Sequence, residues 1–374
     1  MSEMTLLIKP ASGLCNMKCD YCFYADEMHH RQQSSYGIMS DDVMEQVIKK
    51  TLASADKTCT FLFQGGEPTL AGLPFYQKWM ACEQTYNQRQ IKISHALQTN
   101  GYSLDEDWCR FLARHQYLTG LSIDGVRSTH NACRKDPQGE GTFFKVLDAA
   151  RRLQDASAAF NVLTVVTKQT AGKIHRIYES YRRYGFGWQQ YIACLDPLYA
   201  APGSMDYSLT PELYGQFLTD LFHLWKIDLL NGCQPYIRQF ENYIGILLGY
   251  EPECCEQRGI CSFQNVVEAD GSVYPCDFYV LDEYKLGNLC TDDFQTIWEQ
   301  EQQSHFLTRF EHPSSTCAVC PYFVLCRGGC CRHREQSGTS RGHNYFCESY
   351  RMFFDACLEE MEEIASSIKA KKSI

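Results

Sequence analysis

The sequence predicts an α/β fold in which parallel strands are covered by helices, followed by a smaller cysteine-rich region. Short apolar segments alternate with segments of helical periodicity between residues 6 and 192, as in β–α units that build a parallel sheet. Many of the 21 cysteines gather in two groups, one near the N-terminus and one beyond residue 253. The length of 374 residues allows one large domain and a smaller one.

Six strands and five helices are predicted in this alternating part of the chain. The strands are expected at Leu6–Ile8, Thr60–Phe63, Ile91–Leu97, Leu118–Ile123, Asn161–Val166 and Gln189–Ile192. The helices are expected at residues 41–52, Pro74–Tyr86, Asp105–Ala113, Phe143–Leu153 and Ala171–Tyr184. Ser40 is a good N-cap for the first helix. Functional loops in such folds lie at the carboxyl ends of the strands.

Two further elements are predicted in the second half of the chain. Thr210 and Pro211 form a good helix start, and the region Thr210–Tyr250 is expected to be mostly helical. The segment Val266–Tyr274 predicts a β-hairpin with Asp270 and Gly271 in its turn.

Composition and charge exclude several classes of protein. The net charge is −10, which disfavours a nucleic-acid binder because phosphate contacts need clustered cations. No apolar run approaches the roughly 20 residues that a membrane span requires. Residues 1–5 do not begin a signal peptide, so we expect a cytoplasmic protein with no membrane contact. In a reducing compartment, clustered cysteines indicate metal or cluster ligation rather than disulfides.

The first cysteine group offers three thiolates on one short loop, Cys15, Cys19 and Cys22, directly after the first strand. A closed zinc site or cluster normally uses four protein ligands. Three ligands on a 4Fe–4S cluster leave one iron open to another molecule. A zinc site completed by His29 or His30, or a set of buried thiols, stays an alternative.

The second group supplies enough thiolates for two clusters with four ligands each. Its members are Cys255, Cys261, Cys276, Cys317, Cys320, Cys326, Cys330 and Cys347. A pair of zinc ribbons is the alternative. Cys254 adjoins Cys255 and Cys331 adjoins Cys330, so either neighbour can substitute as a ligand.

The first cysteine loop, the aromatic Tyr21 within it and the later triplet Gly65-Gly66-Glu67 together resemble the radical S-adenosylmethionine superfamily. The resemblance implies that the open iron of the cluster is chelated by the methionine part of S-adenosylmethionine. It also implies the residues that bind this cofactor: Gly65, Gly66 and Glu67 for the amino group, Arg134 for the carboxylate, Ser122 for the ribose, and Tyr21 and Leu195 for the adenine. Glycines suit this role because they allow close approach of the backbone to a ligand.

The second cysteine group is similar to the SPASM extension of radical enzymes that modify peptides. In that pattern the first auxiliary cluster takes Cys255, Cys261, Cys276 and Cys330, and the second takes Cys317, Cys320, Cys326 and Cys347. The chain would therefore hold three 4Fe–4S clusters. Fully ligated auxiliary clusters cannot bind substrate directly but can carry an electron away, which implies a two-electron oxidation.

Several longer segments resemble the anaerobic sulfatase-maturating enzymes. These segments are Leu7–Ser12, Phe63–Gly72, Leu97–Gly101, Cys194–Tyr199 and Gly271–Asp282, and the resemblance runs from about Leu6 to about Tyr350. It implies oxidation of a Cys or Ser in a sulfatase motif to Cα-formylglycine. It also implies a partial (β/α)6 TIM-like barrel at residues 1–233 and a SPASM domain at 234–374 that ends in a helix.

Asp277 is the predicted catalytic base, because it follows a cluster ligand and is therefore held rigidly near the redox path. Tyr24 and Gln64 flank cofactor-binding residues and are expected to contact the peptide substrate. The expected partners are a sulfatase polypeptide and an electron donor such as flavodoxin or ferredoxin, and the expected state is a monomer.

A SPASM enzyme that forms a thioether or another crosslink in a ribosomal peptide is the alternative function. It would share every cluster ligand. Such enzymes often carry an N-terminal peptide-recognition domain, and a first strand near residue 5 leaves no room for one. This favours the sulfatase substrate. The sequence alone does not distinguish a Cys target from a Ser target.

Overall fold

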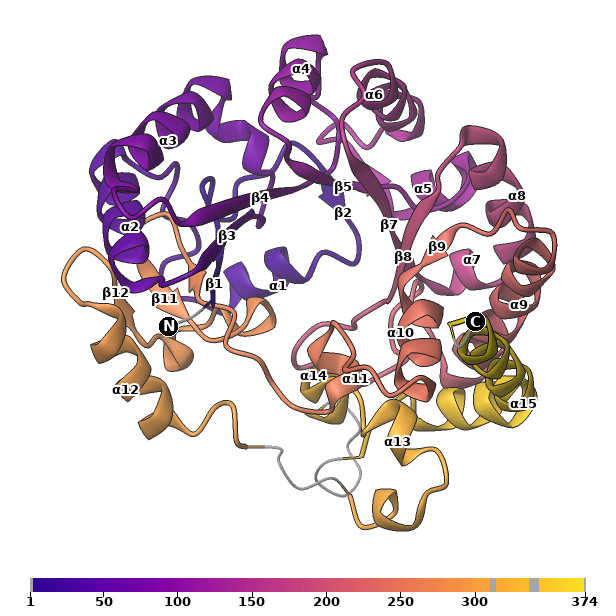
Figure 1. The fold of residues 1–374 in the computed structure, drawn as a ribbon. Coiled ribbons are helices and arrows are strands. Elements are labelled where there is room, and N and C mark those ends of the chain that lie inside the picture. The colour runs from indigo at the N-terminus through magenta and orange to yellow at the C-terminus, as the bar shows by residue number, and fades with distance from the viewer. Residues whose placement is uncertain (1–2, 310–313, 336–342, 373–374) are drawn as a thin grey trace. The chain divides into compact units, whose positions relative to one another are not determined.

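The computed structural model describes residues 3–309, 314–335 and 343–372 (Figure 1). The chain forms two compact units, and each is assembled from separated segments. Unit 1 contains Met1–Ser122, Arg134–Phe160 and Ser262–Leu307. Unit 2 contains Ile123–Cys133, Asn161–Cys261 and Thr308–Ile374. The predicted division of the chain at residues 233 and 234 follows sequence families rather than packing, and it stays a prediction.

Parallel strands form the centre of unit 1. Its strands, in their spatial order, are β12 (Gly287–Asn288), β11 (Ser272–Tyr274), β10 (Val266–Val267), β1 (Glu3–Ile8), β3 (Thr58–Phe63), β4 (Lys92–Thr99) and β5 (Leu118–Ser122). The run from β10 to β5 is parallel, whereas β11 and β12 are antiparallel to their neighbours. The first four predicted strands are therefore confirmed.

The hairpin β10–β11 joins the edge of the sheet beside β1, although the two segments are more than 250 residues apart in the sequence. Leu7 pairs with Val266 and Ile8 pairs with Val267. The predicted hairpin is confirmed, and Gly271 closes its loop with φ +87°, a left-handed conformation that favours glycine. Strand β11 runs antiparallel to β10, and the chain beyond it turns so that Asp277 lies against Gln64, the residue after β3.

In its described residues, unit 1 has the four helices predicted for it and two more, at Phe23–His29 and Phe294–Ser304, that were not predicted. They are α1 (Phe23–His29), α2 (Asp41–Ser54), α3 (Leu73–Tyr86), α4 (Glu106–Arg114), α6 (Phe143–Asp155) and α12 (Phe294–Ser304), with 3-10 turns η1 (Pro68–Ala71), η2 (Asp277–Tyr279) and η3 (Asp282–Tyr284). The Ser40 side chain caps α2 by accepting a hydrogen bond from Val43 N, as predicted. Helix α1 lies on the opposite side of the strands from α2 and α3 (Figure 1).

Unit 2 contains the parallel strands β7 (Phe160–Val166), β8 (Trp188–Ala193) and β9 (Tyr236–Ile237). Its helices are α5 (Arg127–Cys133), α7 (Lys168–Ala171), α8 (Ile174–Tyr184), α9 (Pro211–Leu230), α10 (Arg238–Leu247), α11 (Cys255–Arg258), α13 (Phe323–Cys326), α14 (Cys331–Glu335) and α15 (Cys347–Lys372), with the 3-10 turn η4 (Cys317–Val319). The last two predicted strands and the helical region after Thr210 are confirmed.

The predicted single helix Ala171–Tyr184 is wrong in one respect. The structure has two helices. The Thr167 side chain caps a short helix α7 by accepting from Thr170 N, and α7 ends at Gly172, which with Lys173 separates it from α8. Aromatic side chains hold the long C-terminal helix against α9: the ring centroids of Phe222 and Phe353 lie 6.0 Å apart. Across the described residues, no helix has the length and apolar character that a membrane crossing requires.

Candidate active site and cluster sites

The three-cysteine loop lies between β1 and α1, where backbone hydrogen bonds hold it in place. Cys19 belongs to the short strand β2 (Lys18–Cys19), which pairs with β6 (Arg134–Lys135) so that Cys19 lies opposite Arg134. Cys22 precedes α1, and its N–H donates to Cys19 O over 3.1 Å. Cys15 Sγ accepts from Met17 N over 3.4 Å. The loop therefore presents its three thiols in a fixed backbone frame.

The donor set of this loop fits an iron–sulfur cluster. Thiolates are the protein ligands of such clusters. Burial raises the pKa of Cys22, and the positive charge of Arg134 opposes that rise. His29 and His30, the two possible additional zinc ligands, instead direct Nδ1 to the carbonyl oxygens of Ala25 and Asp26 on their own helix. Within the described ranges, no three His, Cys, Asp or Glu side chains converge as ligands of a single metal ion do.

The triplet Gly65-Gly66-Glu67 follows β3 and packs directly against the start of the cysteine loop. Gly65 and Gly66 have φ values of +103° and +56°. A Cβ on Gly66 would lie 2.3 Å from Leu14 O and 2.9 Å from Ser12 O, so only glycine fits this contact. Glu67 N donates to Leu14 O over 2.8 Å. The glycines are therefore required for backbone approach.

The Glu67 side chain is fully buried and ties three loop segments together. Oε1 accepts from Thr69 N, Thr69 Oγ1 and Thr99 Oγ1 over 3.1, 2.7 and 2.8 Å, and Oε2 accepts from Asn100 N over 2.8 Å. Asn100 in turn donates to Asn16 Oδ1 over 2.8 Å, next to Cys15. The carboxylate of Glu67 is therefore used within the protein, and the role of Glu67 towards a cofactor stays a prediction.

The other predicted cofactor residues are distributed over both units. In unit 1, the Arg134 guanidinium lies 5.5 Å from the centre of the Tyr21 ring. Ser122 Oγ at the end of β5 accepts from Gln98 Nε2 over 3.0 Å. Leu195 belongs to unit 2, where it is buried just beyond the end of β8. The structure thus brings Tyr21 and Arg134 together, and the roles of all four residues stay predictions.

Asp277, Tyr24 and Gln64 converge into one buried hydrogen-bonded group, although they come from η2, α1 and the end of β3. Asp277 Oδ2 accepts from Tyr24 Oη over 2.5 Å and from Gln64 Nε2 over 2.8 Å. Gln64 Nε2 also donates to Tyr24 Oη over 2.7 Å. Asp277 is 5% exposed, and its Oδ1 has no hydrogen-bond partner among the described residues. One carboxylate oxygen is therefore held, and the other is buried without a partner among the described residues.

Two charged residues beside this group were not predicted from the sequence. Lys9, 1% exposed at the end of β1, places Nζ 4.6 Å above the Tyr24 ring. Glu27 is buried on α1 and accepts from Val280 N over 3.1 Å. Burial raises the pKa of Asp277, and the charge of Lys9 opposes this rise most strongly. For Lys9, the sequence offered one signal of a functional role, a charged residue directly after an apolar strand.

A buried ion pair fixes α1 to the hairpin that carries Asp277. Arg31 Nη1 lies 2.7 Å from Glu268 Oε2, and both side chains are inaccessible to solvent. Glu268 is in the hairpin loop, and Arg31 follows α1. Together with the Glu27–Val280 hydrogen bond, this pair connects α1 and the residue that follows it to the segments on either side of Asp277.

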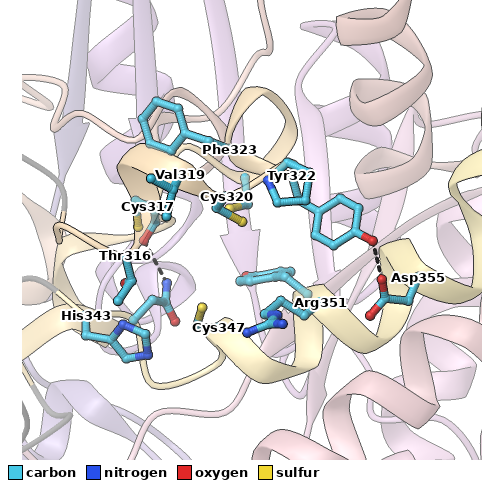
Figure 2. A pocket seen from close by; sticks show the side chains of 15 residues that line it. Thr316, Cys317, Val319, Cys320, Tyr322, Phe323, His343, Cys347, Arg351 and Asp355 are labelled. Atoms are coloured by element: carbon cyan, nitrogen blue, oxygen red, sulfur yellow. Dashed lines mark hydrogen bonds between the residues drawn. The ribbon is translucent and has the colours of Figure 1, made fainter.

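Four cysteines of unit 2 line one cavity of about 430 Å³ (Figure 2). They are Cys317, Cys320, Cys326 and Cys347, the set predicted for the second auxiliary cluster. Burial and the other three thiols raise the pKa of Cys347 to about 11. Tyr322 and Asp355, at the rim, are joined by a hydrogen bond. The donor set and the cavity fit a four-thiolate cluster.

The ligands predicted for the first auxiliary cluster are divided between the units. Cys255, Cys261 and Cys330 belong to unit 2, and Cys276 belongs to unit 1. Cys261 Sγ lies 3.2 Å from Sγ of Cys331, the neighbour of Cys330. The choice between these two adjacent cysteines, left open by the sequence, therefore stays open.

Comparisons with known proteins agree with this geometry. Residues 10–180 match the Radical SAM superfamily, and residues 255–321 match SPASM, an iron-sulfur cluster-binding domain. A cysteine-type anaerobic sulfatase-maturating enzyme of Clostridium perfringens is 43% identical over 99% of this chain and all of its own length. A serine-type enzyme of Bacteroides thetaiotaomicron is 28% identical over 93% of this chain and 88% of its own.

A solved structure also matches over almost the whole chain. It is native anSMEcpe with bound AdoMet and the Cp18Cys peptide, with a TM-score of 0.93, 43% identity, and coverage of 98% of this chain and 99% of that chain. The α/β sheet, the three-cysteine loop and the cysteine-rich C-terminal region define a radical SAM enzyme with a SPASM domain. Within that class, the chain belongs to the anaerobic sulfatase-maturating enzyme family.

Family membership confirms several expectations from the sequence. The resemblance, the radical SAM α/β fold with a C-terminal SPASM domain, and the enzyme class are as predicted. Membership also implies 4Fe–4S clusters and S-adenosylmethionine, which the cysteine sets and the glycine loop described above fit.

Proposed function

We propose that this enzyme oxidises a cysteine in a short sulfatase segment to Cα-formylglycine. The higher identity to a cysteine-type relative, 43% against 28% for a serine-type relative, supports a cysteine target. The observation that carries the proposal is the buried carboxylate of Asp277, which has one oxygen fixed by Tyr24 and Gln64 and the other unpartnered among the described residues.

In this proposal Asp277 is the general base. When bound, S-adenosylmethionine and the iron–sulfur clusters supply the one-electron steps, which remove a hydrogen atom from the target Cβ and then a second electron. Asp277 Oδ1 accepts the thiol proton, so that loss of one hydrogen atom, one proton and one electron converts the thiol to a thioaldehyde. Water then replaces the sulfur, hydrogen sulfide leaves, and the aldehyde remains. A positioned base contributes about 10²–10⁴-fold to such a reaction.

Tyr24 and Gln64 position the base and contact the peptide. Their hydrogen bonds to Oδ2 prevent rotation of the Asp277 carboxylate, so Oδ1 points constantly in one direction. Lys9 stabilises the ionised carboxylate without a direct hydrogen bond. A base prepared in this way needs no rearrangement when substrate binds.

The cofactor and cluster assignments complete the proposal. We assign S-adenosylmethionine to Tyr21, Gly65, Gly66, Glu67, Ser122, Arg134 and Leu195. The close packing of Gly66 on Leu14 and the proximity of Arg134 to Tyr21 support this set. The three clusters take the cysteines named in the sequence analysis, and the barrel and SPASM domains divide between residues 233 and 234.

The remaining expectations concern the cellular setting. We propose that the enzyme acts as a monomer in the cytoplasm and receives electrons from a flavodoxin or ferredoxin. All 21 cysteines are free of disulfides, which supports this setting, because disulfides are rare in a reducing compartment.

The test uses the reconstituted enzyme without oxygen, S-adenosylmethionine, dithionite and a synthetic sulfatase peptide with Cys at the target. Mass spectrometry should show a product in which the thiol is replaced by a carbonyl oxygen. The peptide with Ser at the target should react more slowly. A crosslinked product that retains sulfur would instead support the ribosomal-peptide alternative.

A further inference from the structure

One exposed segment of unit 2 has a charge opposite to that of the whole protein. Residues 166–185 contain five Lys and Arg against one Glu, whereas the complete chain contains 35 against 45. This segment covers the end of β7 and the helices α7 and α8. Because the rest of the surface is acidic, such a segment concentrates the attraction for negatively charged partners.

The cations gather at one end of these helices. We define the basic surface as Arg127, Lys168, Lys173, His175 and Arg176, all of which are exposed. Helices α5 and α7 lie side by side, and α8 follows α7 directly (Figure 1). Lys173 Nζ donates to Ser128 Oγ of α5 over 3.2 Å, which joins the two helices.

Two hollows flank Arg176 within this surface. One, of about 400 Å³, is lined by Arg127, Ser128 and Asn131 with Arg176 itself. The other, of about 290 Å³, lies between the start of α8 and α9 and also contains Asp220, 3.9 Å from His175 Nε2. Throughout the described ranges no carboxylate pairs with Lys168, Lys173 or Arg176. By contrast, Arg182 at the far end of α8 pairs with Asp228 over 3.3 Å.

The basic surface lies at the functional end of its β–α units. Helix α7 begins just after β7 ends, so Lys168, Lys173 and Arg176 lie towards the carboxyl end of that strand. Arg127 comes shortly after Ser122, the last residue of β5. Active sites in folds of this kind lie at the carboxyl ends of the strands.

We propose that the basic surface docks the acidic one-electron carrier that reduces this enzyme. The inference rests on the proposed function, because that chemistry consumes an electron before each hydrogen abstraction. At each encounter the reduced carrier gives one electron to the enzyme and leaves oxidised by one electron. Charge complementarity selects the partner: an acidic protein is attracted here and repelled elsewhere. A nucleic acid would carry its phosphates across the acidic remainder of the surface.

The test compares two reductants on the same holoenzyme. The variant Lys173→Glu/Arg176→Glu is assayed with a flavodoxin kept reduced by its NADPH-dependent reductase, and separately with dithionite. At low salt we expect the flavodoxin-driven formation of 5′-deoxyadenosine to fall at least about tenfold, and the dithionite-driven rate to be unchanged. Raising the ionic strength should slow the parent enzyme and remove the difference, because exposed charges are screened.

Lys57→Glu/Lys92→Glu is the matched control. It makes the same change in net charge, but at the amino ends of β3 and β4 in unit 1. It should keep the parent rate with both reductants. Direct titration of flavodoxin onto the holoenzyme should show weaker binding for Lys173→Glu/Arg176→Glu and not for the control. The affinity of Lys173→Gln/Arg176→Gln should lie between those of the parent and the Glu variant.

Three results would contradict the proposed docking surface. They are an equal loss of 5′-deoxyadenosine formation with dithionite, an equal loss in the control variant, or unchanged flavodoxin binding. A higher KM for a sulfatase with an unchanged flavodoxin rate would assign the surface to the substrate instead. Binding of flavodoxin without formylglycine under dithionite would refute the proposed function but retain the docking surface.

Discussion

The two described cysteine sites are built in different ways. In unit 1, the three-cysteine loop rests on a network of neutral and charged hydrogen bonds that runs from Glu67 through Asn100 to Asn16. In unit 2, the four cysteines line a cavity of about 430 Å³. Cys317 and Cys326 belong to the short elements η4 and α13, Cys320 directly follows η4, and Cys347 begins the long helix α15. We therefore expect the first site to keep its shape through the protein, and the second to depend on the cluster proposed for it.

The largest expected effect separates these two sites directly. Replacing Cys15, Cys19 and Cys22 by Ala should abolish cleavage of S-adenosylmethionine and lower the iron content from about 12 to about 8 per chain. The melting curve followed by circular dichroism should change little, because the Glu67 network is intact. Replacing Cys317, Cys320 and Cys326 by Ala should remove as much iron but expose residues 314–335 to proteolysis. Similar proteolysis in both variants would contradict the comparison.

Asp277→Asn is the next largest change, because it leaves the shape of the site but removes its proton acceptor. Formylglycine formation should fall at least about 10²-fold, while cofactor cleavage and iron content stay at the parent level. Asp282→Asn is the matched control, an exposed aspartate in η3 a few residues further along. Loss of iron together with both activities would show that Asp277 is structural.

Tyr24→Phe sharpens the account of how the base is held. The variant removes the donor that lies 2.5 Å from Asp277 Oδ2 and leaves Gln64 in place. A hydrogen bond to a charged group contributes about 1.5–3 kcal/mol, so product formation should fall about 10-fold to 100-fold. Gln64→Glu, which sets a second carboxylate beside Asp277, should be more severe. A Tyr24→Phe enzyme that matches the parent in kcat and KM would remove this positioning role.

Glu27→Gln is expected to have the smallest effect, on stability rather than chemistry. Burial raises the pKa of Glu27 from 4.5 to about 8, so the folded protein holds a proton that the unfolded chain releases. Stability therefore decreases as pH rises from about 4.5 to about 8 and levels off above that. The Gln variant should flatten this decrease and melt higher than the parent at pH 8. Glu299→Gln, an exposed control, should reproduce the parent curve.

The features that could be predicted from the sequence are those that depend on residues close together in the chain. Cys15, Cys19 and Cys22 lie on one short segment. Ser40 caps the helix that begins at the next residue, so the local sequence was enough to predict both features. Strands of two residues, such as β2 and β9, carry too little periodicity to detect, and they form only because a partner strand lies beside them. The short helix α7 begins at a Thr167 cap, and the break before α8 falls at Gly172 and Lys173, which a helical pattern can include.

The candidate base was predicted, but its surroundings were not. Asp277 was identified by its position after a cluster ligand, and Tyr24 and Gln64 by their neighbours in the sequence. Their mutual hydrogen bonds follow from the pairing of Leu7 with Val266, which joins segments that no local pattern connects. Lys9 and Glu27 acquire their importance only through burial in that assembled group.

Deuterium transfer from the target cysteine tests the central claim, that Asp277 Oδ1 takes the substrate proton after the peptide is bound. The Asp277→Asn enzyme is incubated without oxygen with S-adenosylmethionine, dithionite and a peptide deuterated at the target Cβ. The account predicts deuterium in 5′-deoxyadenosine at a rate close to that of the parent, with formylglycine reduced at least about 10²-fold. Formylglycine formed as fast as by the parent enzyme would contradict it and exclude Asp277 as the base.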